Sequence, residues 1–208
     1  GDTETTVIAW AGDGGTFDIG LQALSGAAER NEDIIYFCYD NEAYMNTGIQ
    51  RSSATPWGAW TTTTPTGEPE ATPKKDMVSI LAAHGIPYIA TASVAYPVDL
   101  VEKVKRARTI RGTRFIHILA PCPPGWKTQN DETIDLARQA VQTRVFPLFE
   151  VENGRNWRLT VDHAGEPVAP YIRRQARFKH LTDEQVERIQ ADVDDRWERL
   201  QRRIDCGT

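Results

Sequence analysis

The sequence predicts an α/β fold, a doubly wound parallel sheet with a helical extension at its C-terminal end. Short apolar runs of strand length alternate with segments whose apolar residues recur at helical spacing. The run at 34–39 is apolar throughout, as expected of a strand buried on both faces of a parallel sheet. The chain has 208 residues, of which 40% are hydrophobic, enough for one domain with a sizeable core or one domain plus an appendage.

Composition narrows the classes of function. The net charge of -5 argues against nucleic acid as the main partner. No apolar run approaches the ~20 residues that span a bilayer, and no signal-peptide pattern opens the chain, so no membrane partner is expected. The three cysteines form no CxxC pair, and a reducing, cytoplasmic setting follows as the default. The absence of an initiator Met, with a strand only a few residues from the start, favours a fragment or a processed chain.

The first strand, predicted at 7–11, leads into a glycine-rich stretch at 12–20 and then a helix that ends near residue 30. A tight glycine turn between strand and helix lets the backbone approach a phosphate and aims free N–H groups at it. Asp13 in this turn is a poor phosphate partner unless a divalent cation lies between them. An ordinary surface turn, with Asp13 capping the helix, is an equal alternative at this point.

The second strand, at 34–39, ends in a cluster of polar residues at 40–48. Ligands of open α/β sheets bind at the carboxyl ends of the strands, so this cluster and the glycine stretch are expected to face one crevice. Asn41 follows Asp13 by 28 positions (41 − 13), about the length of one turn, helix and strand. A carboxylate, an amide oxygen, a backbone carbonyl and two phosphate oxygens would fill most of the octahedral shell of Mg²⁺.

Residues 49–74 are predicted to form a long loop, because they hold four prolines and little apolar periodicity. Loops of this length in compact domains are usually functional or disordered. Trp57 and Trp60 favour a function, although packing against the domain is about as well supported. Helices are predicted beyond the loop at 75–84 and from Pro97, each followed by a strand, at 88–92 and 114–120.

A change in character near residue 145 divides the chain into an α/β domain, 1–145, and a C-terminal extension, 146–208. A helix is predicted at 132–143, and strand-like pieces follow around an Asn-Gly turn at 153–154. The basic stretch that comes next has arginines that could guide an acidic partner, face solvent or contact another subunit: Arg173, Arg174 and Arg177. The last helix starts at a capping box formed by Thr182 and Gln185, and its apolar stripe is expected to pack on the domain or on a partner subunit.

Three segments carry a family resemblance: the glycine stretch 12–20, the segment 40–52 (Asp-Asn-Glu-Ala-Tyr-Met-Asn-Thr-Gly-Ile-Gln-Arg-Ser) and Ala-Pro-Cys at 120–122. The Gly-Asp-Gly opening with its downstream Asn resembles the thiamin diphosphate motif. Together the segments resemble the β subunit of 2-oxoacid:ferredoxin oxidoreductases, the pyruvate synthase group. The similarity covers most of the chain. A dinucleotide-binding fingerprint fits the glycine spacing poorly.

The resemblance implies a set of ligands. Asp13, Asn41 and the carbonyl of Ala43 would bind Mg²⁺, and Asn46 would also lie near the substrate carboxylate as the catalytic candidate. The residues expected to bind the cofactor are Gly12, Asp13, Gly14, Gly15, Asp18, Asn41, Asn46, Thr47 and Gly48. His84 and His117 suit proton transfer by residue type, but their places at a helix end and within a strand favour structural roles.

The family's β subunit also binds a [4Fe-4S] cluster, and Cys122 matches the last of its four cysteine ligands. The other three would precede residue 1, so this chain alone cannot hold such a cluster. Without the resemblance, Cys122 is better explained as a small buried side chain, the interpretation that Cys38 keeps.

The predicted function is oxidative decarboxylation of a 2-oxoacid, pyruvate first, by a thiamin diphosphate- and Mg²⁺-binding subunit that passes electrons through [4Fe-4S] clusters to ferredoxin. Expected partners are the other subunits, including the one that supplies the activating Glu, ferredoxin, and coenzyme A if the substrate is pyruvate. Oxalate, a branched-chain 2-oxoacid and 2-oxoglutarate are alternative substrates. A non-catalytic scaffold subunit is the alternative of another class, and loss of Asp13 or Asn41 would favour it, but both are present.

Overall fold

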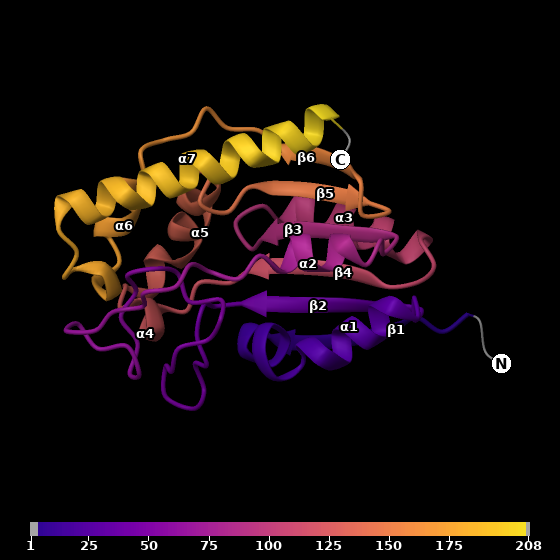
Figure 1. Cartoon of the computed structure of the whole chain (residues 1–208), viewed down its shortest axis with the longest axis horizontal. Helices are drawn as coiled ribbons and strands as arrows, with labels where there is room; N and C mark the ends of the chain where they lie inside the picture. The colour runs from indigo at the N-terminus through magenta and orange to yellow at the C-terminus, as the bar shows by residue number, and fades with distance from the viewer. Residues whose placement is uncertain (1–3, 207–208) are drawn as a thin grey trace.

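Four parallel strands form the centre of the structure, and two antiparallel strands extend the sheet at one edge (Figure 1). The computed structural model of the chain describes residues 4–206. The strands are β1 (Val7–Gly12), β2 (Ile34–Asp40), β3 (Tyr88–Ser93), β4 (Arg114–Leu119), β5 (Leu148–Glu152) and β6 (Asn156–Val161). Their order in the sheet is β1-β2-β4-β3-β5-β6. The predicted α/β class with a mainly parallel sheet is confirmed.

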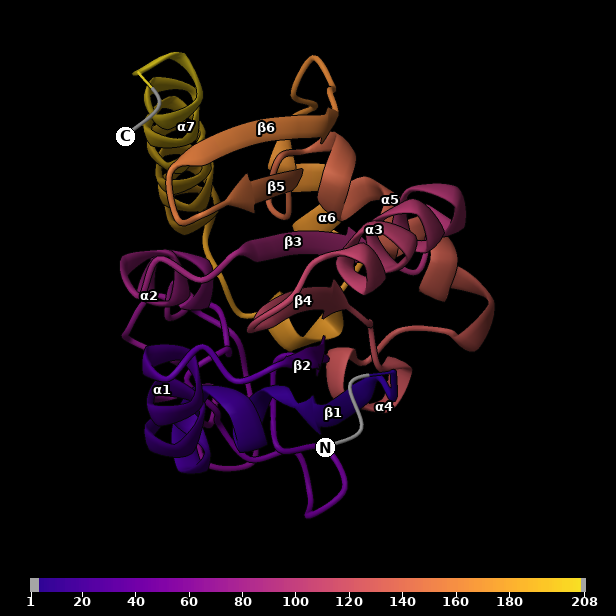
Figure 2. The ribbon, with the colours of Figure 1, turned by 90° about the vertical axis from the view of Figure 1, so that its right-hand side faces the viewer.

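Helices cover both faces of the sheet (Figure 2). One face carries α1 (Leu21–Glu29), α2 (Met77–Ala83) and the C-terminal helix α7 (Asp183–Cys206), and the other carries α3 (Pro97–Thr109). The remaining helices, α4 (Pro123–Trp126), α5 (Thr133–Gln142) and α6 (Val168–Arg173), gather at the end where the parallel strands finish. Within residues 4–206 we find no helix with the length and hydropathy to cross a membrane.

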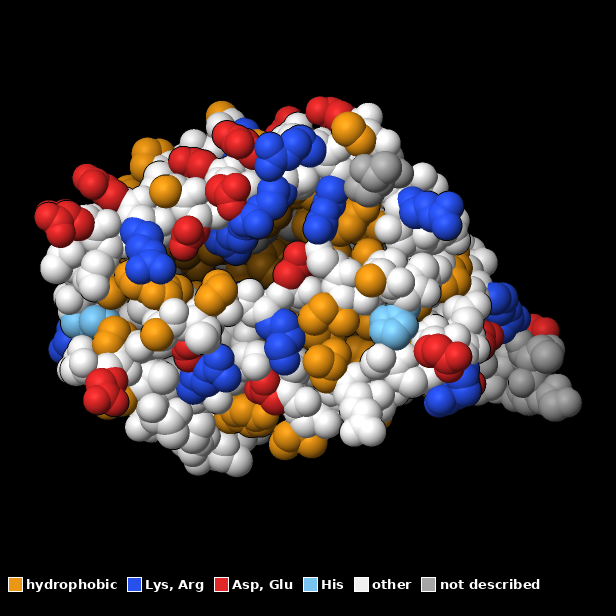
Figure 3. Space-filling model, viewed as in Figure 1, with side chains coloured by type: hydrophobic (Ala, Val, Ile, Leu, Met, Phe, Trp, Pro, Cys, Tyr) orange, Lys and Arg blue, Asp and Glu red, His pale blue; other side chains and the backbone are white. Residues whose placement is uncertain are grey.

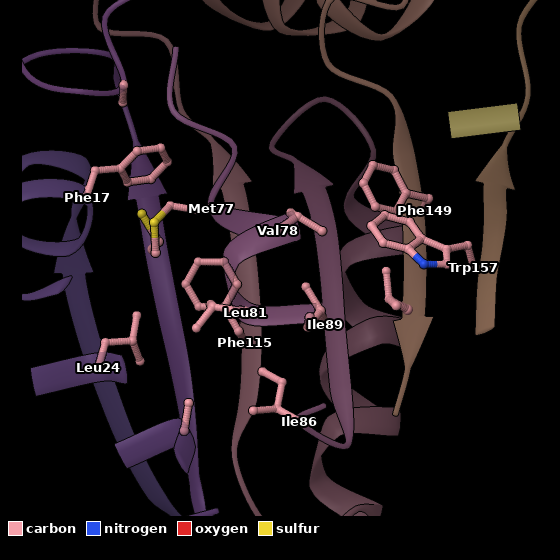
Figure 4. Packing of buried hydrophobic residues seen from close by; sticks show 14 of the residues in the cluster. Phe17, Leu24, Met77, Val78, Leu81, Ile86, Ile89, Phe115, Phe149 and Trp157 are labelled. Atoms are coloured by element: carbon pink, nitrogen blue, oxygen red, sulfur yellow. The ribbon is translucent and has the colours of Figure 1, made fainter. Parts of the chain in front are cut away.

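The core follows from this layering. Both β3 and β4 are buried along their whole length, because helices lie on each side of them. Figure 4 shows a cluster between the sheet and α2, where Leu81, Phe115 and Ile89 meet. A second cluster, which includes Trp126 and Leu136, lies at the carboxyl end of the sheet.

The strand at the parallel edge is less covered. On β1, Ile8 and Trp10 are 58% and 61% exposed. Trp10 lies over Phe37 of β2 with ring centroids 5.0 Å apart, on the face that carries α3. No helix of the described chain covers this part of the face (Figure 2).

The residues after 145 complete the sheet and its cover. The Asn153-Gly154 turn joins β5 to β6, with φ of 52° and 68° at the two residues, and β5 pairs with β3. The capping box at Thr182 is confirmed, since its backbone N–H donates to Gln185 and its hydroxyl accepts in return. The apolar stripe of α7 packs on the domain rather than facing a free partner surface. Below α7 the surface is hollowed, with Lys and Arg side chains on the rim and hydrophobic ones inside (Figure 3).

Candidate functional site

The loops that follow β1, β2 and β4 meet at one end of the sheet, beside α4 (Figure 1). Gly12 pairs with Tyr39, and Asp40 pairs with Leu119, so the three parallel strands end at nearly the same level. The segments that begin at Asp13, Asn41 and Ala120 therefore start side by side. The predicted adjacency of the first two strand ends is confirmed.

The backbone at the glycine stretch differs from the tight turn that the sequence predicts. Asp13 has helical dihedrals (φ -59°, ψ -47°), and Gly14–Ile19 wind as a π-helical turn, η1, that leads into α1. Glycine is required here for close approach rather than for positive φ, because a Cβ on Gly14 would lie 2.2 Å from the Tyr44 ring. The Asp13 side chain makes no capping hydrogen bond to η1 and is buried, so the alternative of an ordinary capped surface turn is wrong.

Asp13 is a buried carboxylate with an incomplete set of partners. Its side chain is 1% exposed, and Oδ2 accepts a hydrogen bond from the Ser52 hydroxyl at 2.5 Å. Burial, together with the negative charge of Asp40, raises the pKa of the Asp13 carboxyl to about 7. A nearby cation would reverse this shift by stabilising the charged form. The site is therefore suited to a positive ligand next to Oδ1.

The amide of Asn41 points between two oxygen atoms. One of its terminal atoms lies 3.1 Å from Asp13 Oδ1 and 2.7 Å from the carbonyl oxygen of Ala43. With nitrogen in that place, the amide donates a hydrogen bond to each oxygen. With oxygen in that place, three oxygen atoms converge, an arrangement that only a shared cation would stabilise.

These spacings fit a magnesium ion. Adjacent ligands of an octahedral Mg²⁺ with bonds of about 2.1 Å are about 3.0 Å apart. The donor set of a carboxylate, an amide oxygen and a backbone carbonyl is the hard-oxygen type that Mg²⁺ takes, leaving further positions for phosphate oxygens and water. Within residues 4–206, no three His, Cys, Asp or Glu side chains form a metal-binding group. The proposed site is not such a group, because two of its three ligands are an amide side chain, that of Asn41, and a backbone carbonyl, that of Ala43.

A raised carboxyl pKa makes the cation-free fold more stable in acid. Between the ordinary value of 3.8 and about 7, the folded state holds a proton on Asp13 that the unfolded chain releases. This contribution is fully present below the unfolded pKa and is lost as the pH rises through the folded pKa. We expect the group to remove about 1 kcal/mol of unfolding free energy per pH unit between about pH 5 and pH 7.

Denaturant unfolding in the presence of a chelator, compared between the wild type and Asp13→Asn, isolates this contribution. The variant should lack the downward slope that the wild type shows. Equal slopes in the two proteins would contradict the assignment.

The predicted diphosphate residues lie on the turn after β2. Asn46, Thr47 and Gly48 are exposed, and Gly48 has a φ of 122° that favours glycine. Gln50 braces the turn, because it accepts from the Thr47 hydroxyl at 2.6 Å and donates to the Thr47 carbonyl at 2.7 Å. The exposed turn leaves its polar atoms accessible to a ligand.

Among the other predicted cofactor residues, Gly12 and Gly14 flank Asp13, and Gly15 is exposed on the first turn of η1. Asp18 is engaged elsewhere. Its carboxylate accepts from the backbone N–H of Ser53 at 3.1 Å and from the Ser53 hydroxyl. Asp18 therefore links η1 to the long loop at 49–74, which contains Ser53.

The sequence did not predict a buried ionic group next to the site, formed by Asp40, Lys74 and His117. Asp40 is fully buried, and Lys74 Nζ and His117 Nε2 lie 2.5 Å and 2.7 Å from its Oδ2. Although burial opposes ionisation, Lys74 and His117 hold the pKa of Asp40 down at about 2. His117 also contacts the rings of Phe17 and Phe146, which fits a structural role.

Cys122 lies next to this site. It is a free, partly buried thiol directly before α4. The backbone N–H of Trp126 donates to its carbonyl at 2.8 Å, while the Trp126 indole donates to the carbonyl of Asn41 at 2.9 Å. One short helix thus joins the cysteine to the turn that holds Asn41. Cys38 is buried within β2, and burial raises the pKa of its thiol, as expected of a structural residue.

The long loop is packed against the domain. Arg188 of α7 lies over the Trp57 ring at 4.3 Å, and Lys127 lies over the Trp60 ring at 3.0 Å. Ser52, from the start of the loop, supplies the hydrogen bond to Asp13. The segment therefore contributes directly to the site, whereas its two tryptophans contact basic side chains of other elements.

The three arginines of the basic stretch have separate places. Arg173 donates to the carbonyl of Leu181 at 2.8 Å, and Arg174 pairs with Glu132 at 2.9 Å. Arg177 is only 3% exposed, so neither a solvated face nor steering of an acidic partner explains it. Its guanidinium donates to the carboxylate of Glu42, in the turn after β2. No local pattern in the sequence indicates that contact.

Comparison with known proteins identifies similar sequences and folds. Residues 1–118 match the model of the thiamine pyrophosphate enzyme, C-terminal TPP binding domain. Pyruvate synthase subunit PorB of Methanocaldococcus jannaschii is 55% identical over 199 residues, which is 94% of this chain and 66% of the relative. Ketoisovalerate oxidoreductase subunit VorB of Pyrococcus horikoshii is 52% identical over 208 residues, 97% of this chain and 67% of the relative. The chain spans about two thirds of the length of these relatives.

A solved structure shares the fold. It is a 2-oxoglutarate:ferredoxin oxidoreductase from Magnetococcus marinus, with a TM-score of 0.51 and 23% identity. The likeness covers 62% of this chain and 50% of that one.

Proposed function

The chain belongs to the thiamine pyrophosphate enzyme family and to the group of subunits that includes PorB and VorB. We therefore propose that it binds the diphosphate end of thiamin diphosphate through Mg²⁺ in a 2-oxoacid:ferredoxin oxidoreductase. The observation that carries the proposal is the convergence of Asp13 Oδ1, the Asn41 amide and the Ala43 carbonyl at 2.7 and 3.1 Å. These three groups would hold Mg²⁺. When bound, thiamin diphosphate supplies the electron sink that lets a 2-oxoacid lose its carboxylate.

This chain's own contribution is binding and orientation. Gly14 lets the backbone pass close to Tyr44, and the Tyr44 hydroxyl donates to the Gly14 carbonyl at 3.1 Å, which fixes η1 against the turn after β2. The exposed turn at Asn46, Thr47 and Gly48 is proposed to contact the diphosphate, with Asn46 near the substrate carboxylate. Such positioning lowers the entropy lost on reaching the transition state.

The rest of the machinery is proposed to lie outside these residues. We expect another subunit to supply the Glu that activates the cofactor. Cys122 is proposed as one ligand of a [4Fe-4S] cluster whose other cysteines are not in this sequence. Ferredoxin as acceptor, and coenzyme A in the case of pyruvate, complete the proposed reaction.

Pyruvate is the first candidate substrate, and a branched-chain 2-oxoacid is the second. Two PorB relatives are 55% and 54% identical to the chain, and two VorB relatives are 52% and 51% identical. The two groups are thus almost equally similar, and the similarity does not separate the substrates.

Calorimetry of the intact complex tests the proposal. We expect thiamin diphosphate to bind only when Mg²⁺ is present, and the complex to reduce ferredoxin with one member of a panel of 2-oxoacids. Absence of Mg²⁺-dependent binding would instead support the scaffold subunit as the function of this chain.

A further inference from the structure

The turn between the two proposed metal ligands has an unusual backbone. Glu42 stands between Asn41 and Ala43 with a φ of 69°, in the left-handed region that non-glycine residues rarely adopt. Its side chain is also buried, at 5% exposure. A buried carboxylate on a strained residue persists only when its surroundings hold it in place. The strain therefore points to contacts that fix this turn.

Two cations from distant parts of the chain hold the Glu42 carboxylate. Lys74 Nζ lies 2.9 Å from Oε1, and Arg177 donates to Oε2 at 2.5 Å. Lys74 also bonds Asp40, and the charges of Asp40 and Glu42 raise its pKa despite burial. The four charges of Asp40, Glu42, Lys74 and Arg177 sum to zero, so each partner is needed to balance the buried group.

Arg177 also supports the turn from a second side. Its guanidinium lies over the Trp126 ring at 4.0 Å, and the indole N–H of Trp126 donates to the carbonyl of Asn41 at 2.9 Å. Gln175 fixes the guanidinium in turn, since its amide oxygen accepts from Nε and from an Nη atom of Arg177 at 3.0 and 2.8 Å. One side chain thus orients both the Glu42 carboxylate and the indole that holds Asn41.

We propose that Arg177, supplied by the C-terminal segment, is a positioning residue that aims the Asn41 amide and the Ala43 carbonyl at the cation. This proposal rests on the proposed function and adds a role at the site for the segment after residue 145, which otherwise completes and covers the sheet. Arg177 acts through Glu42 and Trp126 and is not itself placed against the cofactor.

The sign of the effect separates positioning from simple electrostatics. Replacing Arg177 by methionine removes a positive charge near the site, which by charge alone should make a cation bind more tightly. Loss of positioning should make it bind more weakly, because the turn would relax from its strained conformation. The two explanations predict opposite shifts in the dissociation constant for Mg²⁺.

The experiment measures Kd for thiamin diphosphate and for Mg²⁺ by calorimetry of the intact complex, with kcat at saturating cofactor. For Arg177→Met we expect the Kd for Mg²⁺ to rise by about tenfold while kcat stays within about threefold. Arg177→Lys keeps the positive charge but not the planar guanidinium, so its Kd should lie between those of the wild type and Arg177→Met. The matched control is Arg174→Met. Arg174 lies three residues before Arg177 in the same segment and pairs with Glu132, so its substitution should leave the Kd for Mg²⁺ within about twofold of the wild type.

Glu42→Gln keeps the shape of the side chain and removes its charge. We expect it to raise Kd by about fivefold, and the double variant with Arg177→Met to bind no worse than Arg177→Met alone, because the two residues act as one unit. If Arg177→Met does not assemble, Arg177→Lys still gives the result, because it keeps the positive charge and a higher Kd for Mg²⁺ then reports lost positioning. A Kd for Mg²⁺ that is unchanged or lower in the Arg177 variants would overturn the positioning role.

The outcome for Asp13 distinguishes the two levels of the proposal. If the wild-type complex binds the cofactor and Asp13→Asn does not, while the Arg177 variants bind normally, only the positioning role fails. If the wild-type complex itself shows no Mg²⁺-dependent binding, the proposed function fails, and the positioning role falls with it.

Discussion

Asp13→Asn is expected to weaken Mg²⁺-dependent binding of thiamin diphosphate to the intact complex by at least about hundredfold. Asp13 is the one charged group among the three proposed ligands, and its carboxylate is buried, where charge interactions are strongest. Asparagine keeps the shape and an oxygen but loses the negative charge. Calorimetry with thiamin diphosphate at fixed Mg²⁺ measures the change.

A carboxylate at the opposite end of the sheet gives the matched control. Asp33 precedes β2 and pairs with Arg111 at 2.9 Å and with Arg114. Asp33→Asn makes the same chemical change far from the site and should leave cofactor affinity within about twofold. Binding by Asp13→Asn with wild-type affinity would remove the basis for placing Mg²⁺ here.

Cys122→Ala is expected to abolish most ferredoxin reduction, by about hundredfold, and to lower the iron content of the complex. A [4Fe-4S] cluster normally needs four thiolates, and alanine cannot replace one of them. The variant should still bind thiamin diphosphate, because Cys122 itself is not among the proposed Mg²⁺ ligands. Iron analysis, the electron paramagnetic resonance spectrum of the reduced complex and the rate of ferredoxin reduction report the effect.

Cys206 provides the control for this substitution, since it is an exposed free thiol near the end of α7. Cys206→Ala should keep both the iron content and the rate. If Cys122→Ala also kept them, Cys122 would be only a small partly buried side chain, the explanation that the sequence favours without the family resemblance.

The order of strands and helices could be predicted because it depends on local patterns. The apolar run of β2, the proline at the start of α3 and the Asn153-Gly154 turn each restrict the backbone through nearby residues alone. The adjacency of Asp13 and Asn41 follows from the same patterns, since two consecutive parallel strands that pair must end at one edge.

The backbone of the glycine stretch could not be predicted in the same way. Four glycines indicate freedom at positive φ, yet the residues at 13–19 are helical. Gly14 must be small because the Tyr44 ring packs against it, a contact that exists only after β1 and β2 have paired. Sequence patterns show that a residue is small, but not which neighbour requires it.

The sequence by itself determined the strand and helix pattern and predicted the place of the proposed site at the strand ends and the types of its proposed ligands, because these depend on short-range spacing and on side-chain chemistry. Only the tertiary structure decided the partners that hold the site: Ser52 on Asp13, Lys74 on Asp40, and Arg177 on Glu42. The last pair is 135 positions apart in the sequence. A basic residue in a polar stretch resembles a surface residue, and its burial depends on the packing of segments far away in the chain.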